Sequence, residues 1–166
     1  MKLSSVIPSK IYQLPQLKNK IASWRVTGHT IAFTNGVFDM LHEGHIFSLS
    51  QAAAEADYLI VAVNSDTSVK KLKGPNRPVN NEQARALILA SLIMVDAVII
   101  FGEDTPLHLI TEMMPDIIVK GGDYTQEQVV GAREVLANGG RVVINPLIEG
   151  VSTTAIIDKL RTNHVL

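Results

Sequence analysis

The sequence predicts an α/β fold built on a doubly wound, five-stranded parallel sheet with helices on both faces. Short apolar runs rich in β-branched residues alternate with segments of helical periodicity, which is the pattern of repeated strand–helix–strand units. A length of 166 residues and a hydrophobic content of 46% suit one domain with a substantial core. We therefore expect a single domain over residues 1–166, in which residues 1–28 form a helical N-terminal extension packed on the rest.

The first elements are predicted to be a helix, a strand and a second helix. The leading helix carries an apolar stripe formed by Leu14, Leu17, Ile21 and Trp24. Gly28 closes this helix, and the strand that follows begins at Thr30 and ends near Thr34, before the turn signal Asn35-Gly36. The second helix is indicated by apolar residues at helical spacing, which are Ile46, Leu49, Ala53 and Ala56. Its first turn should contain or just follow His45.

The alternation continues to the end of the chain. Residues 58–63 form a continuous apolar run, as expected of a strand covered on both faces, and a polar loop is predicted over residues 65–81. The remaining prediction is helix 83–92, strand 97–101, helix 105–113 with Thr105 as N-cap and Pro106 as first residue, strand 116–119, helix 126–138, strand 141–145 and a helix after Ser152.

Composition excludes several classes of function. A net charge of −1 argues against a nucleic-acid partner, because a phosphate backbone needs a concentrated positive surface. The absence of cysteine excludes disulfides and thiol chemistry, and suits a reducing compartment. The first residues lack the apolar core of a signal peptide, and no segment approaches the ~20 apolar residues that span a bilayer. We expect a cytoplasmic protein with no membrane partner.

The most informative stretch runs from Thr34 to His45, where a strand passes into a helix. Unpaired backbone N–H groups and the helix dipole favour an anion at a helix N-terminus, and two imidazoles three residues apart, His42 and His45, point from one helical face. Gly44 has no Cβ and lets a ligand approach the backbone. The pattern predicts a binding site for a triphosphate.

Two other interpretations of the histidines remain open at this stage. The first is a zinc site, although the metalloprotease pattern has histidines at i and i+4, and the spacing here is i and i+3. Without cysteine, the other zinc ligands would be a carboxylate, another histidine or water. The second is a pair of ordinary capping or surface histidines.

A longer pattern around the histidines carries a family resemblance. Residues 36–45, Gly-Val-Phe-Asp-Met-Leu-His-Glu-Gly-His, resemble the G-x-F-D-x-x-H-x-G-H signature of the cytidylyltransferase-like nucleotidyltransferase superfamily. Within it, the chain is most similar to the D-glycero-D-manno-heptose 1-phosphate adenylyltransferases, which supply heptose for lipopolysaccharide, through further blocks at residues 61–66, 72–80, 119–124 and 149–154. It departs from many members at Val37, where they have Cys, and at Glu43, where they have Ala, which puts an acidic group beside the phosphates.

The resemblance implies a Rossmann-like sheet, and the positions of the blocks agree with that. Parallel sheets bind ligands beyond the carboxyl ends of their strands. The blocks follow the first, second, fourth and fifth predicted strands, so residues far apart in sequence should converge on one edge of the sheet.

The activity implied is transfer of AMP from ATP to a sugar 1-phosphate, D-glycero-D-manno-heptose 1-phosphate, giving ADP-heptose and pyrophosphate. A phosphate monoester, with a second pKa of about 6, is largely dianionic at neutral pH, so no catalytic base is required. The alternatives are another cytidylyltransferase-like enzyme, of the glycerol-3-phosphate cytidylyltransferase or FAD synthetase type, and a catalytically idle nucleotide-binding module on the same fold.

The resemblance also assigns the site residues. Catalysis falls to His42, His45 and Lys73, nucleotide binding to Thr34, Asn35, Gly36, Phe38, Asp39, Gly44, Arg85, Lys120, Gly122, Asp123, Ser152, Thr153 and Thr154, and substrate binding to Asn64, Asp66, Lys73 and Lys120. Two assignments have structural alternatives. Asp39 is either a metal or ribose contact or a cap of the turn, and Lys73 and Arg85 are either phosphate ligands or solvated charges.

The resemblance implies partners as well. Mg²⁺ should accompany ATP, because it neutralises the triphosphate and usually keeps its own waters with few protein ligands, so its ligands are not identified. Family members commonly form homo-oligomers, which we expect here. Many are fused to a sugar kinase for which this chain has no room, so we expect the kinase to be a separate protein.

Overall fold

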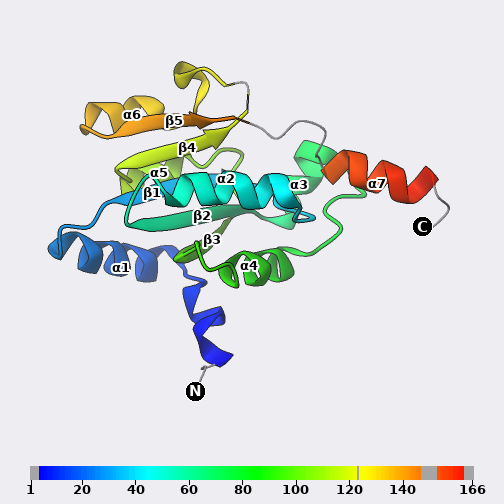
Figure 1. The fold of residues 1–166 in the computed structure, drawn as a ribbon, viewed down its shortest axis with the longest axis horizontal. Helices are drawn as coiled ribbons and strands as arrows, with labels where there is room; N and C mark the ends of the chain where they lie inside the picture. The colour runs from blue at the N-terminus through cyan, green and yellow to red at the C-terminus, as the bar shows by residue number, and fades with distance from the viewer. Residues whose placement is uncertain (1–3, 123, 147–152, 163–166) are drawn as a thin grey trace.

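The computed structural model describes residues 4–122, 124–146 and 153–162, and they form one five-stranded parallel sheet flanked by helices (Figure 1). The strand order is β3-β2-β1-β4-β5. The strands are β1 (Ile31–Gly36), β2 (Tyr58–Asn64), β3 (Ala97–Phe101), β4 (Ile117–Gly121) and β5 (Arg141–Asn145). All four neighbouring pairs are parallel, so the predicted α/β, Rossmann-like, doubly wound sheet is confirmed.

Seven α-helices occur in the described residues. They are α1 (Leu14–Val26), α2 (Glu43–Ala53), α3 (Asp66–Lys73), α4 (Glu82–Ala90), α5 (Leu107–Met113), α6 (Ala132–Ala137) and α7 (Thr153–Thr162). Three short 3₁₀ turns, η1 (Ser4–Val6), η2 (Pro8–Lys10) and η3 (Gln126–Gln128), complete the structure.

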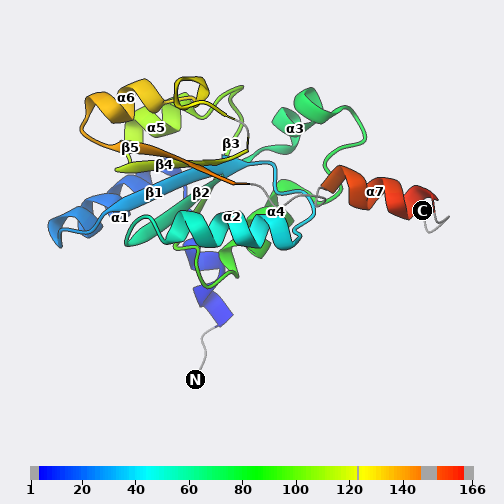
Figure 2. The ribbon, with the colours of Figure 1, turned by 45° about the horizontal axis from the view of Figure 1, so that its top comes forward.

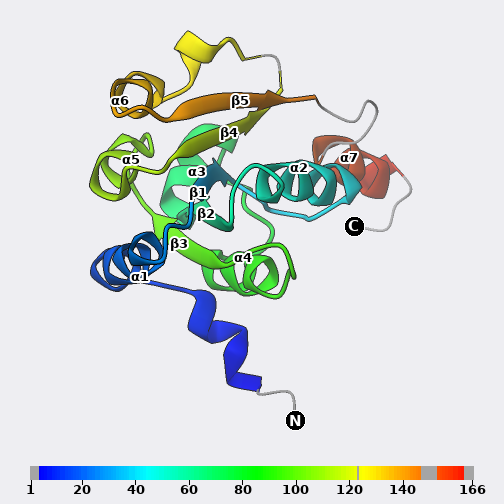
Figure 3. The same cartoon turned by 60° about the vertical axis from the view of Figure 1, so that its left-hand side comes forward.

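The helices cover the two faces of the sheet in separate layers. Helices α1, α5 and α6 pack on one face, and α2 and α4 on the other, as Figure 3 shows. Successive strand residues point to opposite faces. In β1, Ile31 and Phe33 therefore join the core beneath α1, α5 and α6, whereas Ala32 joins the core beneath α2 and α4.

The leading helix packs on the sheet as its apolar stripe predicts. Leu17, Ile21 and Trp24 of α1 are buried, and the Trp24 ring stacks on Tyr58 with the ring centroids 4.1 Å apart. The remaining two helices take a different position, since α3 and α7 lie beyond the carboxyl end of the sheet (Figure 2). At that end, α3 and α7 therefore flank the space beyond the strands, which the helices on the two faces of the sheet do not cover.

The structure corrects the predicted loop over residues 65–81, because α3 occupies its first half. The Ser65 side chain caps this helix by accepting a hydrogen bond from the Ser68 amide at 3.2 Å, and Val69 is fully buried. Gly74, with φ of 95°, ends it. One buried apolar residue is too weak a periodic signal to reveal a short, lysine-rich helix in the sequence.

The predicted helix over residues 126–138 is also wrong in part, since it is divided into η3 and α6. Gly131 lies at the break with φ of 83°, and a Cβ there would stand 2.7 Å from Ile110. Smaller differences concern boundaries. β1 and β4 each extend two residues further than predicted, α5 begins at Leu107, and Ala52 rather than Ala53 is the buried alanine of α2.

None of the helices in the described residues combines the length and the apolar character that crossing a membrane requires.

Candidate active site

A cavity of about 450 Å³ opens where β1 and β4 end. The order of the strands reverses between these two neighbours. Strands β2 and β3 follow β1 on one side, whereas β4 and β5 lie on its other side. The β1–β4 pairing covers only Ala32 with Ile117 and Phe33 with Ile118, although both strands continue for three more residues. In this stretch, where β1 and β4 are not paired with each other, residues 34–36 of β1 and residues 120–121 of β4 line the cavity.

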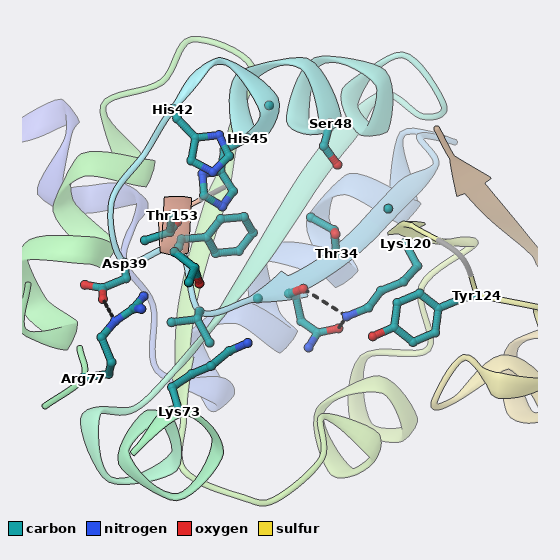
Figure 4. A pocket seen from close by; sticks show the side chains of 17 residues that line it. Thr34, Asp39, His42, His45, Ser48, Lys73, Arg77, Lys120, Tyr124 and Thr153 are labelled. Atoms are coloured by element: carbon teal, nitrogen blue, oxygen red, sulfur yellow. Dashed lines mark hydrogen bonds and ion pairs between the residues drawn. The ribbon is translucent and has the colours of Figure 1, made fainter. Parts of the chain in front are cut away.

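Most of the predicted site residues line this cavity. They are Thr34, Asn35, Gly36, Phe38, Asp39, His42, Gly44, His45, Lys73, Lys120, Thr153 and Thr154. They come from β1 and the loop after it, from the start of α2, from the last residue of α3, from β4 and from the start of α7. Figure 4 shows the labelled side chains directed towards one space. The predicted convergence of distant segments is therefore what the structure has.

The two histidines form a close pair at the N-terminus of α2. His42 is the N-cap residue and His45 lies in the first turn, with the ring centroids 3.8 Å apart and the planes 32° from each other. Phe38, in a left-handed conformation with φ of 48°, lies 5.5 Å from His45, again between centroids. Gly36 makes room for it, because a Cβ there would approach the Phe38 ring to 3.0 Å.

The surroundings of both histidines disfavour the protonated form of the ring. Burial and the neighbouring His42 lower the pKa of His45 to about 4. Burial also lowers the pKa of His42, against a smaller opposing effect of Glu43. Each neutral ring has one N–H donor and one lone pair. The Nδ1 atoms of both rings are buried and make no hydrogen bond with any described residue.

Lys120 supplies a cation from the other side of the gap between β1 and β4. Its Nζ lies 3.3 Å from both the backbone oxygen and the Oδ1 of Asn35, and 5.6 Å from the centroid of the Tyr124 ring. Burial lowers the pKa of Lys120. The ammonium group is thus held at the cavity wall by two neutral oxygens, with no carboxylate among these contacts.

Asp39 lines the cavity, but its carboxylate is engaged in holding two loops together. Oδ1 accepts hydrogen bonds from the amides of Val79 at 2.8 Å and Asn80 at 3.0 Å, and Oδ2 accepts one from Arg77 at 2.6 Å. Although burial raises it, these hydrogen bonds hold the pKa of Asp39 below its ordinary value. The carboxylate thus has a structural role, but it joins two loops rather than capping the turn in which it lies.

Arg85 is not at the cavity wall, contrary to the expectation that it binds the nucleotide. Its side chain is 1% exposed and donates to the backbone oxygens of Asn80 and Val37 and to Oδ1 of Asp66, over 3.0, 2.6 and 2.8 Å. In this arrangement all three guanidinium nitrogens bind protein oxygens. The side chain joins the loop after β1 to the start of α3 and the loop before α4.

The other predicted residues fall into two groups. Asn64 and Asp66 do not line the cavity, since Asn64 is buried and donates to Ser68 Oγ at 3.0 Å, and Asp66 pairs with Arg85. Gly122 also does not line it, although its neighbour Gly121 does. Asp123 and Ser152 lie outside the described residues.

The cavity has further lining residues that the sequence interpretation did not assign. They are Val37, Ser48, Arg77, Gly121 and Tyr124. Ser48 follows His45 by three positions and so lies on the same helical face, a signal that could have identified it. Arg77 and Tyr124 belong to blocks that carried the resemblance, but the sequence does not distinguish a lining residue from its neighbours there.

The cavity offers few ligands for a metal ion. Within residues 4–122, 124–146 and 153–162, no three histidine, aspartate or glutamate side chains gather in a way that could hold one. Asp39 is the one carboxylate among the described lining residues, and both of its oxygens are occupied. Among the described lining residues there is thus no three-ligand site of the kind that zinc needs, and Mg²⁺ stays a prediction, with phosphate and water as its expected ligands.

Comparison with known proteins gives consistent matches. A family model described as cytidylyltransferase-like matches residues 33–159. Relatives named Bifunctional protein HldE are 57% identical over 143 residues in Hyphomonas neptunium, 53% over 152 in Rhodospirillum rubrum and 52% over 153 in Caulobacter vibrioides. These alignments cover 86%, 92% and 92% of this chain but 29%, 31% and 32% of the relatives. The chain thus spans about a third of the length of these curated relatives.

Two solved structures resemble this one. The lipopolysaccharide core biosynthesis protein from Thermoplasma volcanium has a TM-score of 0.58 and 30% identity, over 73% of this chain and 98% of that one. Pantoate-beta-alanine ligase from Francisella tularensis, complexed with beta-gamma ATP and beta-alanine, has a TM-score of 0.57 over 91% of this chain and 76% of that one. At 16% identity, the second likeness concerns the fold alone.

Proposed function

This chain belongs to the cytidylyltransferase-like family, and on that premise we propose that it transfers AMP from ATP to a sugar 1-phosphate. The acceptor we propose is D-glycero-D-manno-heptose 1-phosphate, and the products are ADP-heptose and pyrophosphate. The family assignment and the relatives support the coarser statement that the chain is a nucleotidyltransferase. The sugar, the base and the direction of transfer are the finer part of the proposal.

The observation that carries the proposal is the histidine pair at the N-terminus of α2. The imidazoles of His42 and His45, whose Nδ1 atoms have no hydrogen-bond partner among the described residues, line a cavity that is also lined by Lys73 and Lys120. Donors and cations of this kind suit a polyanion, and a helix N-terminus favours one further. Such a site suits phosphates better than a neutral substrate.

The chemistry follows from what the substrates bring. An oxygen of the sugar 1-phosphate attacks the α-phosphorus of ATP in line, a new P–O bond forms, and the bond to the bridging oxygen breaks as pyrophosphate leaves. The attacking oxygen is already deprotonated at neutral pH, so the protein need not remove a proton. Its task is to hold two anions together and to stabilise the charge that builds up on the phosphates.

We assign this task to the residues that line the cavity. His42 and His45 donate hydrogen bonds to phosphate oxygens near the reacting phosphorus, and Lys73 and Lys120 offset the negative charge. Thr153 lies at the start of α7 and binds the backbone oxygen of Met40 through its hydroxyl at 3.4 Å, which joins that helix to the loop before His42. Mg²⁺, when bound with ATP, would supply further charge neutralisation.

The choice of acceptor rests on the relatives. The protein from Thermoplasma volcanium, 30% identical, is named for lipopolysaccharide core biosynthesis, and the HldE relatives are 52–57% identical. We further propose that a sugar kinase supplies the sugar 1-phosphate. A homo-oligomeric state is likewise part of the proposal.

A substrate panel tests the function. Pyrophosphate release is measured with ATP or CTP against D-glycero-D-manno-heptose 1-phosphate, glycerol 3-phosphate and FMN, with and without Mg²⁺. The proposal expects release with ATP and the heptose phosphate, dependent on Mg²⁺. Release only with CTP and glycerol 3-phosphate, or only with ATP and FMN, would assign another branch of the family. Binding of ATP without release in any combination would indicate an idle module.

A further inference from the structure

Arg77 is a cavity-lining arginine whose side chain is fixed along one edge only. Its Nε donates to Oδ2 of Asp39 over 2.6 Å, and the side chain is 16% exposed. The two Nη groups make no hydrogen bond with any described residue. Figure 4 shows the tip of this side chain beside Asp39, on the side of the cavity where His42 and Thr153 lie.

The backbone around Arg77 is fixed as firmly as the Nε atom. Asp39 Oδ1 accepts the amides of Val79 and Asn80, and Asn80 Nδ2 donates to the backbone oxygen of Asp39 over 2.9 Å. Arg85 holds the backbone oxygens of Asn80 and Val37 on the same two segments. The loop that carries Arg77 and the loop that precedes His42 are therefore joined at several points.

The free edge of Arg77 lies where two cavities meet. A second cavity of about 240 Å³ adjoins the first, between the loop after α3 and the start of α7. Lys73, Arg77 and Thr154 line both cavities, and all three are hydrogen-bond donors. The described residues of the second cavity include no carboxylate, so an anion placed at this junction meets donors on each side.

A purely structural ion pair would use the guanidinium differently. Arginine has five N–H donors, and its strongest pairing with a carboxylate is bidentate, through two parallel hydrogen bonds. Here Oδ2 of Asp39 accepts a hydrogen bond from only one of the five N–H donors of Arg77, and Oδ1 accepts hydrogen bonds from two backbone amides. The four N–H donors on Nη1 and Nη2 remain available in a fixed plane, which is the geometry that binds a phosphate with two hydrogen bonds.

We propose that Arg77 is a further phosphate-binding residue of this active site, and that Asp39 is a positioning residue that sets the plane of its guanidinium. The ligand is a phosphate group of one of the two substrates, bound through Nη1 and Nη2. This inference rests on the proposed function in so far as the phosphates are those of ATP and a sugar 1-phosphate.

Binding measurements test the inference separately from turnover. Arg77→Gln and Arg77→Lys are titrated calorimetrically with a non-hydrolysable ATP analogue and, in a separate arm, with heptose 1-phosphate. Loss of charge-assisted hydrogen bonds should weaken the binding of one of them by about 10- to 100-fold. The arm that changes identifies the substrate whose phosphate Arg77 holds. Lysine should not restore binding, because it supplies a charge but no planar fork.

Lys71→Gln is the matched control. It removes one positive charge from α3, close in sequence to Lys73, but its Nζ pairs with Asp104 at 3.3 Å and the side chain is 64% exposed. The control variant should bind both ligands within about twofold of the parent, since an exposed charge contributes little. A comparable loss in the control and in Arg77→Gln would show a general effect of charge and overturn the proposal.

The positioning role of Asp39 has its own readout. If Asp39 acts through Arg77, then Asp39→Asn weakens the same ligand as Arg77→Gln, and the double variant is no weaker than the more affected single variant. The affected KM should rise while the KM of the other substrate stays unchanged, provided that circular dichroism shows all variants folded. A uniform loss of activity with both KM values unchanged would assign Asp39 a structural role only.

Two further results overturn the proposal for Arg77. One is that Arg77→Gln binds both ligands with parental affinity. The other is that Arg77→Lys binds them with parental affinity, which would mean that a positive charge alone is sufficient. The proposed function fails in a different way. If the parent protein releases no pyrophosphate with any sugar phosphate, but Arg77→Gln still binds the ATP analogue more weakly, the phosphate contact stands and the acceptor assignment does not.

Discussion

The two ends of the sheet treat polar groups in opposite ways. At the amino end, an aspartate directly precedes each of β2, β3 and β4, and its carboxylate accepts a backbone N–H from the neighbouring strand or the residue before it. Asp57 binds the amide of Thr30 at 2.8 Å, Asp96 that of Leu59 at 2.8 Å, and Asp116 that of Ile31 at 2.9 Å. Here the polar atoms are satisfied within the protein.

At the carboxyl end, residues that line the cavity have polar atoms without protein partners. The Nδ1 atoms of His42 and His45 are buried and unpartnered among the described residues, and only Nε of the Arg77 guanidinium donates to a described residue. An unsatisfied buried polar group costs stability. The comparison therefore separates an end whose polar contacts stabilise the sheet from an end whose unpartnered groups we propose bind substrate, and substitutions at the two ends should have different readouts.

The largest expected effect is on activity at the carboxyl end. His42→Ala and His45→Ala should each lower the rate of pyrophosphate release by about 10²–10³-fold, as loss of one donor to a developing charge does elsewhere. The free energy of unfolding should stay the same or rise, because neither Nδ1 has a partner to lose. His108→Ala, at an exposed position of α5, is the control. Parental rates in both cavity variants would defeat the roles assigned here.

The converse effect is expected at the amino end. Asp116→Ala leaves the fully buried amide of Ile31 without its acceptor and should lower the free energy of unfolding by about 1–3 kcal/mol. Urea unfolding measures this, and pyrophosphate release per folded molecule should be unchanged. Asp104→Ala, whose side chain is 83% exposed, serves as the control. A loss of activity without a loss of stability would contradict the division between the two ends.

The two ends should also respond to different ranges of pH. The pKa of His45 is lowered from 6.5 to about 4 by burial and by His42, so between these values the unfolded state binds a proton that the folded state does not. The free energy of unfolding should fall as the pH drops from 6.5 to 4, by about 1–2 kcal/mol after solvent screening is allowed for. His45→Gln should remove this fall.

Asp57, at the amino end, should affect stability over a lower range of pH than His45. Hydrogen bonds from the backbone and side chain of Thr30 hold the pKa of Asp57 below 3.8. Its contribution to stability is therefore complete above that value and is lost as the pH falls through the lower pKa of the folded state. Asp57→Asn should therefore lower the free energy of unfolding above about pH 4, and its difference from the parent should shrink as the pH falls further. Denaturant unfolding at a series of pH values distinguishes the two windows, and a single shared transition would refute the assignment.

The smallest effect should come from an exposed ion pair at the amino end. Arg141, the first residue of β5, pairs with Glu55 over 2.6 Å, with side-chain exposures of 52% and 28%. Arg141→Gln should lower the free energy of unfolding by about 0–1 kcal/mol, and 1 M NaCl should reduce the difference further. A loss as large as that of Asp116→Ala would mean that exposed charges, rather than the buried amide contacts, stabilise this end.

Prediction from the sequence succeeded where a local pattern carries the information. The bounds of β3 and β5 were predicted to the residue, because apolar runs with turn signals on both sides define them. Helix α3 and the break at Gly131 were missed, since a capping contact to Ser65 and the packing of Ile110 decide them. These contacts depend on the folded neighbours and leave little trace in the periodicity.

The same distinction applies to the site. His42, Gly44 and His45 could be identified because they lie close together in one motif, which places them on one turn of helix whatever the rest of the chain does. Ser48 follows from helical spacing once α2 is known. Arg85 and Arg77 could not be told apart, because both are arginines in the segment between β2 and β3.

The sequence by itself determined the order of the five strands along the chain, the edge of the sheet at which the cavity opens and the histidine motif. Only the tertiary structure decided which arginine faces the cavity and which is buried. Arg77 meets Asp39 across 38 positions and Arg85 meets Val37 across 48. The burial and the partners of each arginine are set when the loops after β1 and α3 pack together. The role of a charged side chain therefore depends on which of its donors this packing leaves without a protein partner.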